Sequence, residues 1–301
     1  MKNNNMHKAK EAKNDEFYTQ LSDIENEMKH YRKHFKGKKI FLNCDDPVES
    51  NFWKFFSMQF DVLGLKKLTA THYNENGSSY SLCLSEYGKE PKRKELKGNG
   101  DFRSDESIAL LKKCDIVVTN PPFSIVGEFL DTLMKHDKKF IYVGNFMNVS
   151  RQDVFKYFKE KRMWCGVSPR SMDFALPKDA TSFDSIDANG NKIKKVNTVW
   201  FTNLEHTKQH LEHDAYLYTK DGKYTRLDNN GFLNVDKATD IPKDYYEEMA
   251  VPITFMAKIN TNQFDILGVM SSTKITSSNL GYPILNGNRK GARVVIKRIK
   301  D

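Results

Sequence analysis

Residues 115–124 read DIVVTNPPFS, a hydrophobic run of strand length that leads directly into Asn120-Pro121-Pro122-Phe123. Proline fixes its own φ and restricts the residue before it to extended geometry, so the backbone after this strand is stiff. It holds the Asn120 side-chain amide and the Pro121 carbonyl as acceptors that face one point, with the Phe123 ring beside them. Two acceptors and a flat apolar face suit a planar heterocycle with an exocyclic amino group, such as adenine.

Strand and helix patterns alternate on both sides of this stretch. Short hydrophobic runs predict strands at 38–43, 66–73, 79–87, 115–119 and 139–145. Helical patterns lie between them, between Ser22 and Gly37 and at 49–59, 105–113, 125–136 and 150–160. The alternation predicts an α/β fold with βαβ units and a mostly parallel sheet covered on both faces. Such sheets bind ligands outside the carboxyl ends of their strands, which is where Asn120 lies.

Capping boxes mark two of these helix starts. Ser22 with Glu25, and Ser150 with Asp153, have the spacing at which a hydroxyl and a carboxylate cap the first turn. Gly37 has the position of a residue that ends the first helix. We therefore expect the two helices to begin beside Ser22 and Ser150.

The pattern changes after about residue 180. Asn189-Gly190 is a hairpin signal that precedes VNTVWF at 196–201, and it predicts an antiparallel hairpin at the end of the sheet. Short strand-like pieces separated by polar loops follow. We expect a flexible basic tail at 1–15, a larger domain at 16–205 and a smaller region packed on it at 206–301.

Charge and cysteine content limit the classes of function. The chain has 301 residues and a formal charge of +9, which favours a polyanionic partner, although a lysine-rich surface kept for solubility is the alternative. The four cysteines form no CxxC pair, which argues against a zinc site and against a disulfide framework. No metal site is expected. With no apolar run of membrane-span length and no signal peptide, we expect a cytoplasmic protein.

Acidic residues follow the first predicted strand, in Asn43-Cys44-Asp45-Asp46-Pro47. A phosphate-binding loop would need glycines here, so the usual dinucleotide and nucleoside-triphosphate sites are excluded. Two adjacent acids repel phosphate but favour a cationic cofactor without phosphate, such as S-adenosylmethionine. A surface turn ahead of a helix is the alternative interpretation.

Two further segments can complete such a site. Residues 16–20 read EFYTQ, in which Phe17 is an anchor and Tyr18 and Thr19 can present a hydroxyl and backbone amides to a carboxylate. A plain hydrophobic anchor before a helix explains this segment equally well. In the second segment, Asp101 can accept a hydrogen bond from an adenine amino group while Phe102 packs on the ring.

A basic stretch precedes this second segment. Within residues 89–97, Lys92, Arg93 and Lys94 are consecutive cations. A mobile loop of this composition can hold a nucleic acid backbone, and a solvated insertion is the alternative.

In this order, the segments resemble the EcoRI-type family of adenine-specific DNA methyltransferases. The resemblance covers most of the chain and is carried by residues 14–25, 43–47, 98–104, 115–124 and 196–204. It implies a class I, Rossmann-like methyltransferase fold, S-adenosylmethionine as methyl donor, and N6 of adenine in double-stranded DNA as acceptor. It also implies that the 16–205 domain binds the cofactor and that the C-terminal region recognises the target.

The chain departs from the broader amino-methyltransferase pattern at two points. It lacks the glycine-rich first loop, and Thr71, His72 and Tyr73 stand where an acid is expected after the second strand. Glu75 could bind the ribose in its place.

The resemblance assigns a mechanism to the proline-rich segment. The amino lone pair of adenine is delocalised into the ring, and hydrogen bonds from its protons to the Asn120 side chain and the Pro121 carbonyl would localise it. In-line displacement then needs positioning more than a general base. The base must be flipped out of the duplex and stacked, here on Phe123. Trp200 or Phe201 could cover its other face, with a buried strand aromatic as the alternative for each.

Two other classes stay open at this point. One is a methyltransferase that acts on RNA or on a protein amide, because similar loops serve those substrates. The other is a non-catalytic DNA-binding protein on a methyltransferase fold. We expect double-stranded DNA as the partner and no contact with a membrane. We also expect the chain to act as a monomer. A cognate restriction endonuclease that acts on the same site is compatible with this interpretation.

Overall fold

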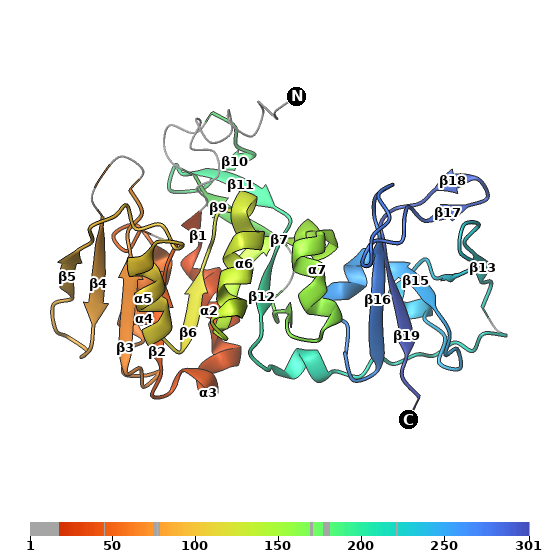
Figure 1. Cartoon of the computed structure of the whole chain (residues 1–301), viewed down its shortest axis with the longest axis horizontal. Coiled ribbons are helices and arrows are strands. Elements are labelled where there is room, and N and C mark those ends of the chain that lie inside the picture. Colours follow the sequence, from red (N-terminus) through yellow and green to blue (C-terminus); the bar gives the residue numbers. More distant parts are fainter. Residues whose placement is uncertain are drawn as a thin grey trace. The chain divides into compact units, whose positions relative to one another are not determined.

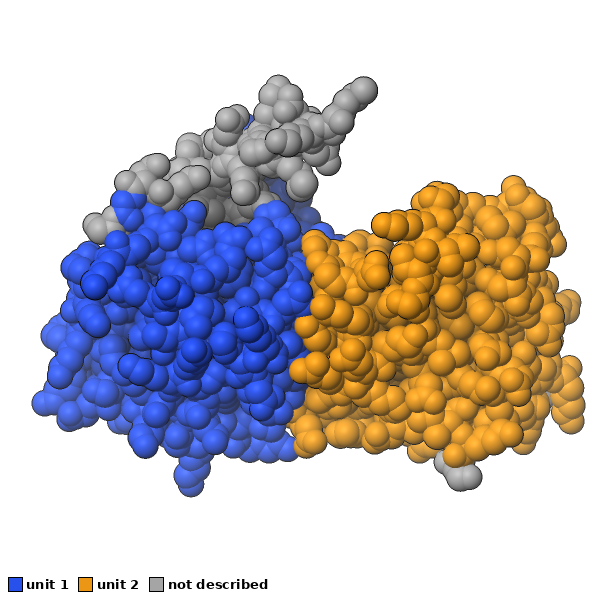
Figure 2. Space-filling model, in the orientation of Figure 1, with its two compact units in different colours: residues 1–146, 167–204 blue, residues 147–166, 205–301 orange. Residues whose placement is uncertain are grey.

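The computed structural model of the chain describes residues 18–44, 46–74, 77, 79–168, 171–176, 181–220 and 222–300. Phe17, Asp45 and Glu75, all named above as candidates, lie outside the described residues. The chain divides into two compact units, which Figure 2 distinguishes by colour. Unit 1 comprises residues 1–146 and 167–204, and unit 2 comprises residues 147–166 and 205–301. Residues 147–166, placed by the sequence pattern in the larger domain, thus group with the C-terminal residues.

A mixed sheet forms the centre of unit 1, with the strand order β5-β4-β3-β2-β6-β7-β12 (Figure 1). Its parallel core consists of β3 (Lys67–Thr71), β2 (Lys39–Leu42), β6 (Ile116–Thr119) and β7 (Lys139–Asn145). Antiparallel strands flank this core, namely β4 (Tyr80–Leu84), β5 (Lys92–Glu95) and β12 (Thr198–Thr202). The predicted α/β fold is confirmed, but the sheet is mixed rather than mostly parallel, because parallel pairing is confined to these four core strands.

Helices cover both faces of this sheet (Figure 1). Because side chains alternate along a strand, Ile40 and Leu42 face one side and Phe41 the other. The first side packs on α4 (Asn51–Met58) and on α2 (Leu21–Met28), which continues through η1 (Lys29–Tyr31) and α3 (Arg32–Phe35). The other side carries α5 (Asp105–Lys113), η2 (Phe123–Ile125) and α6 (Val126–Lys135).

Both predicted capping boxes are wrong. Helix α2 begins at Leu21, because the Gln20 carbonyl already accepts from the backbone N–H of Asp23 and of Ile24. Helix α7 (Gln152–Lys159) follows Arg151. Ser150 donates to a backbone carbonyl instead, and Asp153 pairs with Arg151 at 2.6 Å. Gly37 ends the first helical region with a φ of +71°, as predicted.

A second, antiparallel sheet of unit 1 has the order β1-β9-β11-β10. Its strands are β1 (Tyr18–Thr19), β9 (Met172–Ala175), β11 (Lys192–Val196) and β10 (Ser185–Ile186). The Asn189-Gly190 turn joins β10 to β11, so the predicted terminal hairpin does not lie in the large sheet. Residues 198–202 leave this hairpin and pair with β7 as β12.

Unit 2 is built on an antiparallel-rich sheet with the order β13-β14-β15-β19-β16. These strands are β13 (Thr225–Arg226), β14 (Leu233–Asn234), β15 (Met249–Pro252), β19 (Arg293–Arg298) and β16 (Phe264–Met270). A separate ribbon consists of β17 (Ile284–Leu285) and β18 (Asn288–Arg289). The remaining short elements are η3 (Phe146–Ser150), β8 (Trp164–Cys165), η4 (Thr207–His210), η5 (Ala238–Asp240) and η6 (Ile253–Ala257). No helix in the described part of the chain has the length and apolar character to cross a membrane.

Candidate active site

The strand order of unit 1 reverses at β2, which lies between β3 and β6. The chain first adds β3 on one side of β2 and later adds β6 on the other, and all three strands are parallel. Crevices at such reversal points are where open α/β sheets bind ligands. Phe41 is level with Val117, so Asn43 after β2 and Asn120 after β6 leave the sheet at the same edge. The structure thus brings together two segments that are about 75 residues apart in the sequence.

The proline-rich segment turns directly from strand β6 into helix. Thr119 ends β6 fully buried, and Pro121 is also buried. Pro122 has an extended backbone (φ −56°, ψ 126°), after which η2 begins at Phe123 and leads into α6. The Asn120, Pro122 and Phe123 side chains are half-buried. Rigid backbone and partial exposure suit a group that must contact a ligand in one fixed geometry.

Thr19 lies beside the start of α4. Its carbonyl accepts a hydrogen bond of 2.8 Å from the Asn51 side chain, which fixes β1 against the first turn of that helix. The Thr19 side chain is 4% exposed, and its hydroxyl has no hydrogen-bond partner among the described residues. Buried hydroxyls are almost always hydrogen-bonded, so this one is suited to a ligand. Tyr18 precedes it on β1.

Asp46 forms the turn ahead of a helix that was the alternative interpretation of this segment, and its carboxylate also lies near His72. Its Oδ1 accepts from the Val48 backbone N–H at 2.9 Å, just before α4, and its Oδ2 lies 3.4 Å from Nε2 of His72. Asn43 is buried with its Oδ1 3.7 Å from the half-buried Cys44 thiol, and Pro47 is buried. The acidic turn is therefore held both by backbone and by a residue after β3.

Tyr80 on β4 connects this turn to the edge of the sheet. The His72 ring stacks on it with centroids 4.9 Å apart, and the Arg93 guanidinium lies 3.7 Å from its centroid. Burial raises the pKa of the Tyr80 hydroxyl, and the adjacent Asp46 carboxylate adds to the rise. His72 and Tyr80 support the site, and neither was predicted from the sequence.

Lys92, Arg93 and Lys94 lie on the edge strand β5, so the prediction of a mobile loop is wrong. β5 pairs with β4 in a register that sets Tyr80 opposite Glu95. All three cations are exposed, and Arg93 also pairs with Glu95 at 2.8 Å. Charged side chains on an edge strand prevent pairing with a second sheet, which explains the composition without excluding contact with a polyanion.

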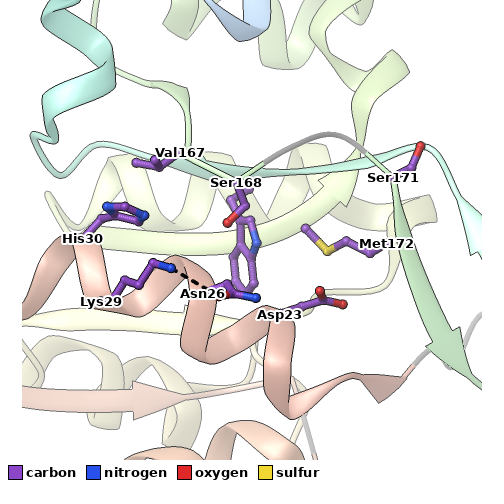
Figure 3. Close-up of a pocket in the computed structure, with 9 residues that line it drawn as sticks. Asp23, Asn26, Lys29, His30, Val167, Ser168, Ser171 and Met172 are labelled. Atoms are coloured by element: carbon purple, nitrogen blue, oxygen red, sulfur yellow. Dashed lines mark hydrogen bonds between the residues drawn. The ribbon is translucent and has the colours of Figure 1, made fainter.

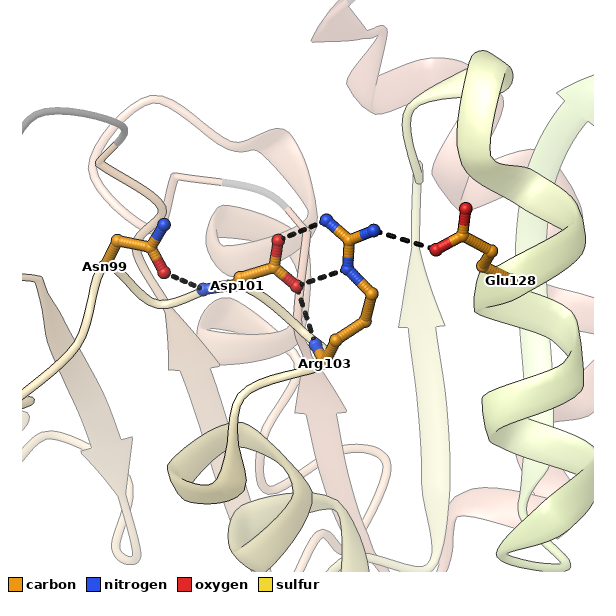
Figure 4. Close-up of polar contacts among 4 residues, drawn as sticks. All are labelled: Asn99, Asp101, Arg103 and Glu128. Carbon is orange, nitrogen blue, oxygen red and sulfur yellow. Dashed lines mark hydrogen bonds and ion pairs between the residues drawn. The ribbon is translucent and has the colours of Figure 1, made fainter.

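Asp101 and Phe102 have protein partners in the structure, and Figure 4 shows those of Asp101. Arg103 binds both oxygens of Asp101, with Nη2 to Oδ2 at 2.7 Å, and reaches Glu128 on α6 at 2.8 Å. The hydrogen bonds from Arg103 lower the pKa of Asp101. Phe102 is 5% exposed and packs edge-on against Phe129 at 5.5 Å. Arg103 follows Asp101 by two residues and could have been noticed in the sequence, whereas Glu128 could not.

A pocket of about 420 Å³ lies elsewhere in unit 1, beside α2 (Figure 3). Its lining includes Asp23, Asn26, His30, Ser168 and Trp200, and Trp200 is the one lining residue that was named above as a candidate for the site. Burial, together with the neighbouring Asp173, raises the pKa of Asp23.

The two aromatic candidates for the second face of the base are both fully buried. Trp200 packs edge-on against Phe52 at 5.9 Å, and Phe201 stacks on Tyr142 at 5.1 Å. Trp200 and Phe201 are therefore buried strand aromatics, which was the alternative interpretation of each residue. No cluster of three metal-ligating side chains occurs among the residues that the structure describes.

Comparison with known proteins identifies the family. The profile described as "Adenine-specific methyltransferase EcoRI" matches residues 5–298. The chain is 44% identical over 286 residues to the type II methyltransferase M.EcoRI of Escherichia coli, covering 87% of this chain and 88% of that protein. It is 39% identical over 315 residues to M.MpnI of Mycoplasma pneumoniae, with 97% of both chains covered. M.MgeORF184P of Mycoplasma genitalium is 35% identical over 311 residues, covering 97% and 98%. No solved structure matches. The chain therefore belongs to the EcoRI family of adenine-specific methyltransferases, and the activity expected from its motifs, methylation of adenine in DNA, is confirmed at the level of that family.

Proposed function

We propose that the chain transfers a methyl group from S-adenosylmethionine to N6 of an adenine flipped out of a specific site in duplex DNA, as the methyltransferase of a type II restriction–modification system. The observation that carries this proposal is the position of Asn120-Pro121-Pro122-Phe123 at the carboxyl end of β6, beside the reversal of strand order at β2. The parallel core followed by antiparallel β12 supports a class I methyltransferase fold.

The residues at this edge fit the cofactor. The buried Thr19 hydroxyl, which lacks a partner among the described residues, offers a hydrogen bond to its polar groups. The half-exposed Asp46 carboxylate attracts its cationic or hydroxyl groups, and Asn43 adds a buried amide. Tyr18, Thr19, Asn43 and Asp46 would hold the cofactor, which when bound supplies a sulfonium methyl group.

Asn120 and Pro121 act on the acceptor base. The Asn120 Oδ1 and the Pro121 carbonyl accept the two amino protons of adenine, which makes the nitrogen pyramidal and turns its lone pair outward. Because Pro121 and Pro122 fix the backbone, the two acceptors keep their separation without a cost in entropy at the moment of reaction. The half-buried Phe123 ring offers a stacking face for the extruded base. Transfer of the methyl group leaves a positive charge on the amino nitrogen, and this cation is strongly acidic, so solvent can take one of its protons.

The proposal also gives unit 2 a role, in contact with DNA. The unit has a sheet separate from that of unit 1, and its last 35 residues before Asp301 contain no acidic side chain. Seven basic residues and no acidic ones in this segment suit contact with a polyanion. We therefore assign recognition of the DNA target to unit 2 and cofactor binding to unit 1.

Incubation of the full chain with S-adenosylmethionine labelled at its methyl group tests the proposal. Duplex DNA, RNA of the same sequence and a protein extract are offered in separate reactions, and the modified nucleosides are identified after digestion. We expect N6-methyldeoxyadenosine, formed only with duplex DNA. Label in RNA or in protein would assign another substrate, and no transfer despite cofactor binding would leave a DNA-binding protein without activity.

A further inference from the structure

The end of unit 2 has an unusual charge pattern. Residues 266–300 contain no Asp or Glu, although the whole chain has 39 acidic residues. The basic residues of this segment are Lys274, Arg289, Lys290, Arg293, Lys297, Arg298 and Lys300. Carboxylates of other segments pair with two of these cations, Asp236 with Arg293 at 3.0 Å and Glu247 with Lys297 at 3.6 Å. The remaining excess of cations suits contact with DNA phosphates.

Strands β17 and β18 form a two-stranded ribbon within this segment (Figure 1). Asn286 and Gly287 connect the strands with φ values of +52° and +72°. Two positive φ values in a two-residue connection are those of a type I′ turn, which matches the twist of a tight hairpin. Residues 286–289 are all exposed. The ribbon therefore presents four consecutive residues to solvent.

The ribbon is anchored in unit 2. Leu285 is buried in a small core with Leu227, Met270 and Val295. The Asp228 carboxylate accepts hydrogen bonds from the backbone N–H of Asn286 at 3.2 Å and of Gly287 at 2.8 Å. The backbone N–H of Asp228 donates to the Ile284 carbonyl at 2.9 Å. A tip fixed in this way loses little conformational entropy when it binds.

The Arg289 guanidinium stacks on an aromatic ring at this tip. The guanidinium carbon lies 3.2 Å from the centroid of the Tyr282 ring, and the Tyr282 carbonyl accepts from the Asn229 side chain at 3.0 Å. Stacking uses the face of the guanidinium and leaves N–H groups along its edge. A planar pair of N–H donors matches O6 and N7 of guanine in the major groove.

We propose that the β17–β18 ribbon enters the major groove of the target DNA and that Arg289 reads a guanine of the recognition sequence. The inference rests on the proposed function, because it names the element of unit 2 that selects the methylated site. A two-stranded ribbon has the width that the major groove admits. Lys290 directly follows Arg289 and can contact the phosphates.

The test compares Arg289→Ala and Arg289→Lys with the wild-type chain. Turnover is measured on a duplex with the wild-type site, and methylated adenines are sequenced in the DNA of expressing cells. We expect both variants to lose about 10- to 100-fold in turnover on that duplex. The methylated sites should no longer require guanine at one position. Lysine keeps the charge but not the planar pair of donors. If Arg289 contacted only a phosphate, Arg289→Lys would therefore keep its activity.

Lys237→Ala is the matched control, because Lys237 is an exposed cation of unit 2 outside the acid-free segment. It should change neither turnover nor the methylated sequence. Thermal unfolding and calorimetric cofactor titration establish that all variants are folded and bind S-adenosylmethionine.

Three results would overturn the inference. They are a wild-type site without guanine, unchanged site choice in Arg289→Ala, and full activity of Arg289→Lys. In each case methylation of adenine by the wild-type chain would still support the proposed function. Failure of the wild-type chain to methylate any DNA would instead refute the proposed function, and this inference with it.

Discussion

Nε2 of His72 lies 3.4 Å from Oδ2 of Asp46, and this contact joins the residues that follow β3 and β2. His72 stands after the second parallel strand, where the sequence lacks the expected acid. The Val48 backbone N–H holds the other oxygen of Asp46, and Tyr80 supports the His72 ring by stacking. An acid that follows the first strand is thus oriented by the residue that follows the second.

His72→Ala should weaken binding of S-adenosylmethionine by about 3- to 10-fold, or roughly 1 kcal/mol, because Asp46 loses one of its two restraints. Asp46→Asn should weaken it further, since it removes the charge. Calorimetric titration of both variants measures this, with the exposed Glu86→Gln as control. Unchanged affinity in Asp46→Asn would remove this turn from the cofactor site.

Asn120→Ala should lower methyl transfer by more than about 100-fold, which is roughly 2.7 kcal/mol of barrier, and leave cofactor affinity largely intact. The expected partner of the amide oxygen is the amino group of the target base, which is not part of the cofactor. Single-turnover kinetics with labelled cofactor give the rate. A variant within about tenfold of the wild-type rate would exclude Asn120 from the reaction.

Gly100→Ala should destabilise unit 1 by about 2 to 4 kcal/mol. Gly100 has a φ of +81°, and an added Cβ would lie 1.9 Å from the His72 carbonyl oxygen. Gly98→Ala is the control, because its Cβ would meet only the Glu106 carboxylate, at 3.8 Å. Urea unfolding of both variants tests this, and equal stabilities would contradict the close approach of the two segments.

Replacing both Lys92 and Lys94 with Gln should weaken DNA binding equally for all sequences. If both contact phosphates, the slope of log affinity against log salt should become less steep by about 2 units. Site preference should persist, because phosphate contacts carry no sequence information. Titrations at several salt concentrations measure the slope, with Lys33→Gln as control. An unchanged slope would leave β5 as a charged sheet edge without contact to DNA.

Unit 2 should lose stability as the pH falls below about 6.5. Burial lowers the pKa of His213, and the nearby Arg298 lowers it further. Its ring packs edge-on against Phe255 at 5.2 Å. A histidine whose folded pKa lies below its unfolded value stabilises the fold fully above the unfolded pKa, and this contribution is lost as protons bind. Thermal unfolding between pH 8 and 5 should show a smaller loss for His213→Gln than for the wild-type chain.

Local patterns in the sequence predicted the elements that have a clear hydrophobic run or clear signals at their ends. Strand 139–145 and helix 105–113 have the predicted bounds, since one is a continuous apolar run and the other has a Ser104 cap and lysines at its end. Strand β5 was missed because all four of its side chains are exposed and only pairing with β4 defines it. Asn189-Gly190 likewise specified a turn, but the partners of the strands around it depend on distant residues.

For the candidate site too, only part of the arrangement could be predicted from the sequence. The order of strands and the residues that end them indicated where Asn120 and Asp46 would lie. Their supporting contacts could not be predicted, because His72 and Tyr80 come from other strands and Glu128 reaches Arg103 from α6. Phe102 was expected to pack on the adenine ring, but in the structure it is buried against Phe129.

The division of the chain has a consequence for engineering and for evolution. The polypeptide passes between the units three times, after residues 146, 166 and 204, so neither unit is one continuous segment. A single crossover at the start of the C-terminal region would separate α7 from the β16 strand that it contacts. Recombinants that exchange site preference between relatives should therefore need residues 147–166 and 205–301 to be inherited together from one parent.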